Sequence, residues 1–92
     1  AIQHHVVAAL SGGIAEQRLA ALELPDGLTP REGEVLALIA DGLTNAEIAQ
    51  RLTVTPTTIK SHINHIFAKA SIRDRAQAVR YAYRHGIAEP PR

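Results

Sequence analysis

The chain has 92 residues, a formal net charge of +1 and no cysteine. This length suits one small domain with a single modest core. Without cysteine, disulfides and thiolate metal sites are excluded, and a reducing, cytoplasmic setting is the expected one. No apolar run approaches the ~20 residues that span a bilayer, which excludes membrane-spanning classes. Methionine is also absent, so we expect these residues to be a fragment of a longer polypeptide.

Charge is distributed unevenly along the chain. Residues 1–55 carry three arginines against seven acids, a net charge of −4, whereas residues 56–92 carry seven basic residues against two acids, a net charge of +5. Such an asymmetry is typical of nucleic-acid-binding chains, and it predicts that phosphate meets the C-terminal half.

Residues 1–27 are predicted to be a partly helical linker or the remnant of an upstream domain. Two short apolar stripes are interrupted by Ser11-Gly12-Gly13. Leu24-Pro25-Asp26-Gly27 then closes the segment, because proline disfavours helix in the residue before it and Asp-Gly favours a turn.

A sharp helix signal follows, since Thr29, Pro30 and Glu32 supply an N-cap, a first-turn proline and a capping-box acid. This helix should run from Pro30 to about Asp41, where Asp41-Gly42 ends it.

The next two helices repeat the same signals. Thr44 caps the second helix with Glu47 at its third position, and Thr55 caps the third with Pro56 at its first. Because only Thr53-Val54 separates the second helix from the cap of the third, the two must cross steeply, as in a helix-turn-helix.

The third helix, residues 56–69, has two distinct faces. Its apolar residues recur at helical spacing and predict a core face: Ile59, Ile63, Ile66, Phe67 and Ala70. The opposite face is then hydrogen-bonding, cationic and small: Thr57, Lys60, Ser61, Asn64, His65 and Ala68. No acid occurs between Pro56 and Arg73, as expected of a surface that meets phosphate.

A last helix is predicted over about 74–85, followed by a frayed tail over 88–92. Its apolar side is predicted to consist of Ala76, Ala78, Val79, Ala82 and Tyr83. The residues expected to face outward are Gln77, Arg80, Tyr81 and Arg84.

With these residues in view, the chain resembles the LuxR-type helix-turn-helix domain, the output module of NarL/FixJ-class response regulators. The matching strings are LTPREGEVLALIADGLTNAEIAQRL, TPTTIKSHINHIFAKASIRDRAQAV and YAYRHGI, within residues 28–87. The resemblance implies an all-α, four-helix domain that binds double-stranded DNA as a homodimer and regulates transcription, with RNA polymerase as a candidate partner. It implies base reading by Lys60, Ser61 and Asn64 of the recognition helix. It also implies a dimer contact through Gln77, Arg80, Tyr81 and Arg84.

The chemistry of the outward face agrees with this expectation. Lysine can donate to guanine, asparagine can pair with adenine and serine can bond several base edges in the major groove. Candidate contacts to phosphate, or flanking the bases, are Thr44, Asn45, Thr55, Thr57, Thr58, His65, Lys69, Arg73 and Arg75. Thr44 and Thr55 are expected mainly to cap their helices. For Arg73 and Arg75 the alternative is a salt bridge with Asp74 or an acid of the first helix, and for Arg75 this alternative weighs equally.

Neither a metal site nor an enzyme is predicted. The pairs His4-His5 and His62/His65 lack further ligands that would complete a metal site, so no metal is expected. The chain has no cysteine, no glycine-rich phosphate loop and no acid pair in a recognisable pocket, so no enzyme is predicted and no cofactor is implied. The alternatives to a response regulator are a LuxR-type regulator with a ligand-sensing upstream domain, and a helical protein-interaction module that does not bind DNA.

Overall fold

The computed structural model describes residues 24–89. Its elements, in chain order, are the 3-10 turn η1 (Pro25–Gly27) and the helices α2 (Pro30–Ala40), α3 (Asn45–Leu52), α4 (Pro56–Ala70) and α5 (Arg75–Arg84). No strand occurs between residues 24 and 89, so the predicted all-α class with four helices is confirmed. Within this range no helix is long and apolar enough to cross a membrane. The expected helical segments in residues 1–23 lie outside the described residues.

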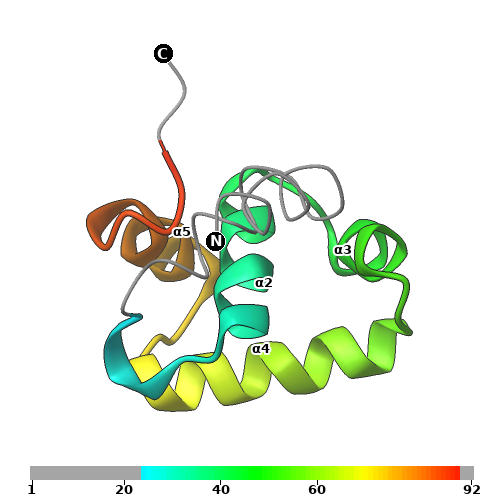
Figure 1. Cartoon of the computed structure of the whole chain (residues 1–92), viewed down its shortest axis with the longest axis horizontal. Coiled ribbons are helices and arrows are strands. Elements are labelled where there is room, and N and C mark those ends of the chain that lie inside the picture. Colours follow the sequence, from blue (N-terminus) through cyan, green and yellow to red (C-terminus); the bar gives the residue numbers. More distant parts are fainter. Residues whose placement is uncertain (1–23, 90–92) are drawn as a thin grey trace, which may run out of the picture.

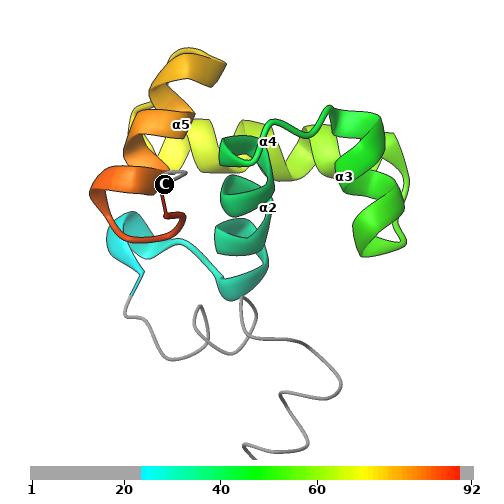
Figure 2. The same cartoon turned by 90° about the horizontal axis from the view of Figure 1, so that it is seen from above.

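The helices are arranged around α2. In Figure 1, α4 runs along the lower edge, α2 stands on it, and α5 and α3 lie to either side. Figure 2, seen from above, shows α2 between α5 and α3 with α4 behind it. Each of the other three helices contacts α2, which makes it the centre of the domain.

The helix starts are set by the predicted side-chain caps. Capping boxes are complete at Thr29/Glu32 and Thr44/Glu47: each threonine hydroxyl accepts from the glutamate N–H, and each glutamate accepts from the threonine N–H. Thr55 caps α4 by accepting from the Thr58 N–H at 3.2 Å. These local bonds satisfy N–H groups that have no partner within the helix.

The joint between α3 and α4 is a tight turn on a left-handed residue. Thr53 has φ 59°, and the next N–H, that of Val54, donates to the Ala49 carbonyl at 2.9 Å. A non-glycine residue in this region costs roughly 1–2 kcal/mol, so the packing on both sides must hold it. Leu52 and Val54, on either side of Thr53, are half-buried against the core and supply that packing.

The core lies where the apolar faces of the four helices meet. Its buried residues are Leu28, Val35, Leu36, Ile39, Ile48, Ala49, Ile59, Ile66, Ile72, Ala78, Tyr81, Ala82, Ile87 and Ala88. The predicted core face of α4 is confirmed, with Ile59 and Ile66 fully buried and Ile63, Phe67 and Ala70 packed at its margin.

Two predictions for the C-terminal part are wrong. In α5, Ala76 is exposed and Tyr81, expected outside, is buried with 8% exposure. The buried side follows the i, i+3, i+4 spacing of Ala78, Tyr81 and Ala82, which places these three on one helical face. Ala88, assigned to the frayed tail, is also buried, and its N–H donates to the Ala82 carbonyl at 3.2 Å.

A buried carboxylate joins α2 to the end of α4. Glu32 is 3% exposed, and its Oε1 accepts from the Thr29 N–H at 2.9 Å and from Lys69 Nζ at 2.8 Å. Lys69 Nζ also donates to the Gly27 carbonyl at 3.3 Å. We call this set of contacts the Glu32 clamp. Burial by itself would raise the pKa of Glu32, but the bonds from Lys69 and Thr29 and the lysine charge outweigh it and hold that pKa below its ordinary value.

This lowered pKa gives the clamp a pH signature. A carboxyl whose pKa is lower in the folded state stabilises the fold above its unfolded pKa and loses that contribution as pH falls through its folded pKa. Glu32→Gln keeps a capping oxygen but removes the charge. We expect it to lower the free energy of unfolding by about 1 kcal/mol at neutral pH, because Lys69 is partly exposed. Measured by urea unfolding, the difference from wild type should shrink as pH falls below 4.5, the ordinary glutamate value.

Glu47→Gln is the matched control, because Glu47 occupies the same capping position in α3 without a lysine bound to it. An equal pH-dependent loss in both variants would show that Lys69 adds nothing to the clamp.

Candidate nucleic-acid interface

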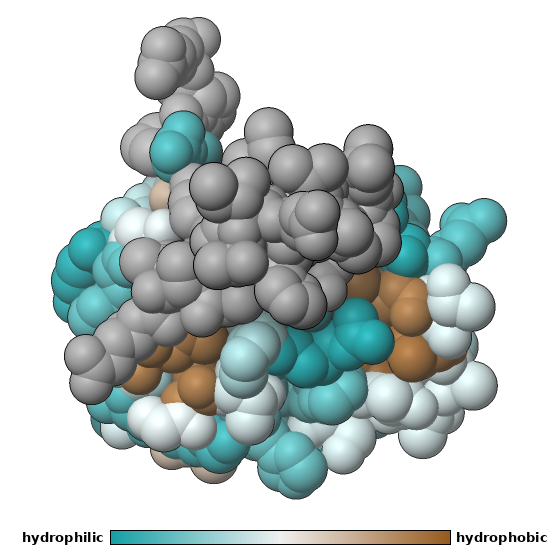
Figure 3. Space-filling view, in the orientation of Figure 1, coloured by the Kyte–Doolittle hydropathy of each residue, from teal (hydrophilic) through white to brown (hydrophobic). Residues whose placement is uncertain are grey.

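The face of α4 that points away from the other helices is polar along its length. Lys60, Ser61 and Asn64, the predicted base-reading residues, are all exposed. The rest of this outward face is exposed as well: Thr57, His65 and Ala68. In the space-filling view, the lower edge formed by α4 is largely teal to white, that is, polar to neutral (Figure 3). We call these six residues the α4 face.

The α4 face is rigidly presented because the opposite side of the same helix is core. Ile59 and Ile66 are fully buried, which fixes the rotation of α4 about its axis. The positions of residues 60, 61 and 64 follow from that rotation, so their side chains share one surface. An α-helix with such a surface fits the major groove, which is about 12 Å wide.

The N-terminus of α4 presents further polar groups. The hydroxyls of Thr55 and Thr58 are 3.0 Å apart and bond each other, in addition to the Thr55 cap. Both are therefore engaged in closing the helix end, which agrees with capping as the main role of Thr55. Thr57 is exposed in the same turn. The helix N-terminus with its partial positive charge is the part of this end suited to phosphate.

Two of the predicted phosphate contacts, Asn45 and Arg75, bind each other. Arg75 Nη1 donates to Asn45 Oδ1 at 3.0 Å, and Nη2 donates to the Leu43 carbonyl. These bonds join the start of α5 to the connection before α3, so Arg75 has a structural role. A guanidinium has five donors, and the two bonds leave others for a phosphate beside the α3 cap at Thr44.

The remaining basic residues near α4 differ in what they bind. Lys69 belongs to the Glu32 clamp, so its charge is already opposed by a buried carboxylate. Between residues 24 and 89 the ion pairs are Lys69–Glu32 and Arg31–Glu34, so no acid of this range is paired with Lys60 or Arg73. Lys60 and Arg73 are therefore the cations best placed to meet an added anion.

The α5 residues predicted to contact a second copy lie in different environments. Arg80 and Arg84 are exposed. Gln77 is half-buried, and its Oε1 accepts from the Arg73 N–H at 2.9 Å. Tyr81 donates its hydroxyl to Asp26 Oδ2 at 2.7 Å, and its ring centroid lies 4.4 Å from that of His85. Tyr81 thus holds η1 against α5, and the structure does not place it on the outer surface.

The histidines in residues 24–89 do not assemble with acids into a larger cluster. His62 is half-buried and His65 exposed. Throughout the described part of the chain, no group of three or more His, Asp or Glu residues could hold a metal ion. His4 and His5 lie outside the described residues.

Sequence comparisons give the context for this surface. The family described as "Bacterial regulatory proteins, luxR family" matches residues 26–82. The chain is 46% identical over 65 residues to proteins named "Response regulator protein VraR" from Staphylococcus aureus (strain NCTC 8325 / PS 47), Staphylococcus saprophyticus and Staphylococcus epidermidis. The match covers 71% of this chain and 31% of each relative, so the chain spans about a third of the length of these curated relatives.

The Tyr81–Asp26 bond can be tested by a double-mutant cycle. Tyr81→Phe keeps the ring, and Asp26→Gly removes the carboxylate while tolerating the positive φ of 57° at that position. Tyr81→Phe should destabilise the domain, and the double variant should lose about 1 kcal/mol less than the sum of the two single changes. Chemical denaturation measures all four free energies.

Tyr83→Phe provides the matched control, because its hydroxyl donates to the Ala40 carbonyl at 3.3 Å and not to a side chain. Its effect should be additive with Asp26→Gly. Additivity of the Tyr81 and Asp26 changes would mean that their bond contributes nothing.

Proposed function

Because the chain belongs to the luxR family of bacterial regulatory proteins, we propose that it reads specific sequences in double-stranded DNA through α4. A LuxR-type helix-turn-helix is a DNA-binding and non-enzymatic domain. The observation that supports sequence-specific reading is the α4 face. It is exposed, contains no acid and lies on the helix that corresponds to the recognition helix of the family.

Base reading is proposed for three residues of the α4 face. Lys60 can donate to guanine O6 and N7, and Asn64 can form a bidentate pair with adenine N6 and N7. Ser61, beside Lys60, can bond several base edges. Each good bidentate contact discriminates by about 1–3 kcal/mol, so one copy alone supplies moderate specificity.

Phosphate contacts are proposed around this reading surface. The N-terminus of α4 with Thr57, and the exposed Arg73 beyond its C-terminus, flank the α4 face at its two ends. Arg75 and Asn45 form a second cluster near the Thr44 cap. Such contacts position a protein on the duplex without reading its sequence.

Dimerisation through α5 is proposed to double the reading surface. Gln77, Arg80 and Arg84 line the outer side of α5, and Tyr81 supports them from the buried side. Two copies related by a two-fold axis would read an inverted repeat whose half-sites lie about one helical turn apart. The domain would act in the cytoplasm, with RNA polymerase as a candidate partner.

The parent protein is proposed to be a two-component response regulator. This rests on the name of the matched relatives and on the fraction of their length, 31%, that the chain covers. The rest of such a protein would hold a receiver domain whose phosphorylation shifts the dimer equilibrium. A ligand-sensing upstream domain is the alternative.

Selection from a random duplex pool tests the proposal whatever the operator sequence is. Wild type should enrich an inverted repeat. On that duplex, Asn64→Ala and Lys60→Ala should each weaken binding by about 1–3 kcal/mol and relax preference at one position per half-site. Fluorescence anisotropy on selected and random duplexes measures both effects.

Arg51→Ala is the control, since it removes one exposed positive charge from α3, outside the α4 face. It should leave base preference unchanged. If Lys60→Ala weakened selected and random duplexes equally, Lys60 would be a phosphate contact and not a base reader. If folded wild type bound no duplex at low salt, the domain would be a protein-interaction module instead.

A further inference from the structure

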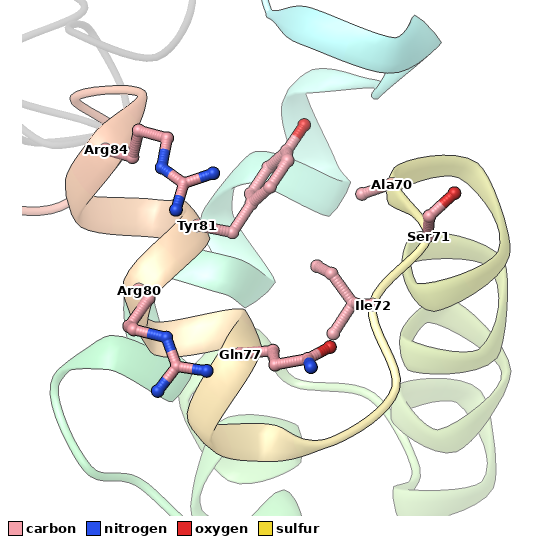
Figure 4. Close-up of a pocket in the computed structure, with 7 residues that line it drawn as sticks. All are labelled: Ala70, Ser71, Ile72, Gln77, Arg80, Tyr81 and Arg84. Carbon is pink, nitrogen blue, oxygen red and sulfur yellow. The ribbon is translucent and has the colours of Figure 1, made fainter.

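A polar groove lies where α4 passes into α5. Its volume is about 260 Å³. Residues 70–72, at the end of α4, form one wall, and Gln77, Arg80, Tyr81 and Arg84 of α5 form the other (Figure 4). We call it the α5 groove. Most of its lining surface is polar, which sets it apart from an apolar docking groove.

Two arginines dominate the charge of the α5 groove. Arg80 and Arg84 are four residues apart, about one helical turn, so they share one side of α5. Like charges at this spacing repel each other. No acid occurs from Arg75 to Arg84, and neither arginine forms an ion pair with an acid in residues 24–89. Within residues 24–89, the two guanidiniums therefore have no ion-paired carboxylate.

The other side chains that line the groove add donors and no carboxylate. Gln77 uses its Oε1 to accept from the Arg73 N–H, which leaves its amide N–H groups as donors. Asp26, which accepts the Tyr81 hydroxyl at 2.7 Å, is not among the residues that line the groove. A groove rich in donors and short of acceptors fits an oxyanion.

We propose that the α5 groove binds a phosphate group between Arg80 and Arg84. The planar guanidinium presents paired donors that match phosphate oxygens, and two guanidiniums one turn apart can grip a single group from two sides. The chemistry is that of phosphate from either of two sources, the DNA backbone or the free ion.

A phosphate in the α5 groove would affect dimer formation. This step rests on the proposed dimer contact through α5. In a two-fold contact made by the outer side of α5, Arg80 and Arg84 of one copy would approach those of the second copy. Unoccupied grooves oppose this approach by like-charge repulsion. A phosphate in each groove neutralises the arginines and permits the contact.

The first test uses the chain without DNA. Titration with sodium phosphate, at ionic strength held constant with sodium chloride, should give saturable shifts of the arginine side-chain NMR signals. Arg80→Gln/Arg84→Gln should weaken this binding at least 10-fold, and Arg80→Lys/Arg84→Lys, which keeps the charge but loses the fork, should lie between. Arg31→Gln/Arg51→Gln, which removes two exposed arginines elsewhere, should bind like wild type. Absence of saturation in wild type, or equal binding by the Arg80/Arg84 glutamine variant, would overturn the proposal.

The second test identifies the source of the phosphate. If the source is the free ion, phosphate should raise the dimer fraction of wild type in sedimentation without DNA, and not that of Arg80→Gln/Arg84→Gln. If it is the DNA backbone, the same variant should reduce the slope of log affinity against log salt by about one per copy. Identical behaviour of wild type and variant in both arms would refute a role in assembly. If wild type bound no duplex at all, the proposed function would be refuted. The phosphate titration would still decide separately whether the α5 groove binds phosphate.

Discussion

The buried carboxylate of Glu32 is the interaction on which the orientation of the α4 face depends. It sits near the N-terminus of α2, the helix that contacts all others, and receives the ammonium of Lys69 from the last turn of α4. Only Ile59 and Ile66 of α4 are completely enclosed, and they lie seven residues apart on one stripe. Such a stripe fixes the rotation of the helix about its axis. The Lys69 bond adds a directional contact at the far end of the helix, which fixes its position along the axis.

Two anions compete for Lys69: a phosphate at the surface and the carboxylate of Glu32. A phosphate contact at an exposed surface gives a modest, salt-screened gain. Drawing Lys69 away would leave Glu32, 3% exposed, with its charge opposed only by the Thr29 N–H, and an unsatisfied buried charged group costs about 1–3 kcal/mol or more. Because this cost exceeds the gain at phosphate, Lys69 stays on Glu32. Lys60, in the middle of the α4 face, and Arg73, beyond the end of α4, form no ion pair within residues 24–89.

Much of this fold could be predicted because its decisive signals are local. The helix starts at Pro30, Asn45 and Pro56 follow from cap residues within three positions, and the two faces of α4 follow from a period that needs only its own sequence. Isolated helices of 8–15 residues are marginal, so such caps matter to each of them. The exposure of Lys60, Ser61 and Asn64 was predictable for the same reason.

The errors and omissions arise from contacts between distant residues. The Lys69–Glu32 pair spans 37 residues, Arg75–Asn45 spans 30 and Tyr81–Asp26 spans 55. No short-range pattern encodes which lysine meets which acid. The burial of Tyr81 has a detectable signal in the spacing Ala78, Tyr81, Ala82, but a tyrosine also carries a polar hydroxyl, which is compatible with either side of a helix. Tyrosine resolves this conflict by burying its ring and donating its hydroxyl to a partner at the rim, here Asp26.

The contacts of η1 connect the two proposed contact surfaces. The Gly27 carbonyl accepts from Lys69 of α4, and the Asp26 carboxylate accepts from Tyr81 of α5. Asp26 itself holds a left-handed backbone, φ 57°, which is unfavourable for a residue with a side chain unless its surroundings impose it. One three-residue turn thus bonds both the helix that carries the α4 face and the helix that carries the α5 groove. A displacement of η1 would break its bonds to Lys69 and Tyr81 and so loosen the α4 face and the α5 groove together. The turn therefore couples the start of the domain to both surfaces.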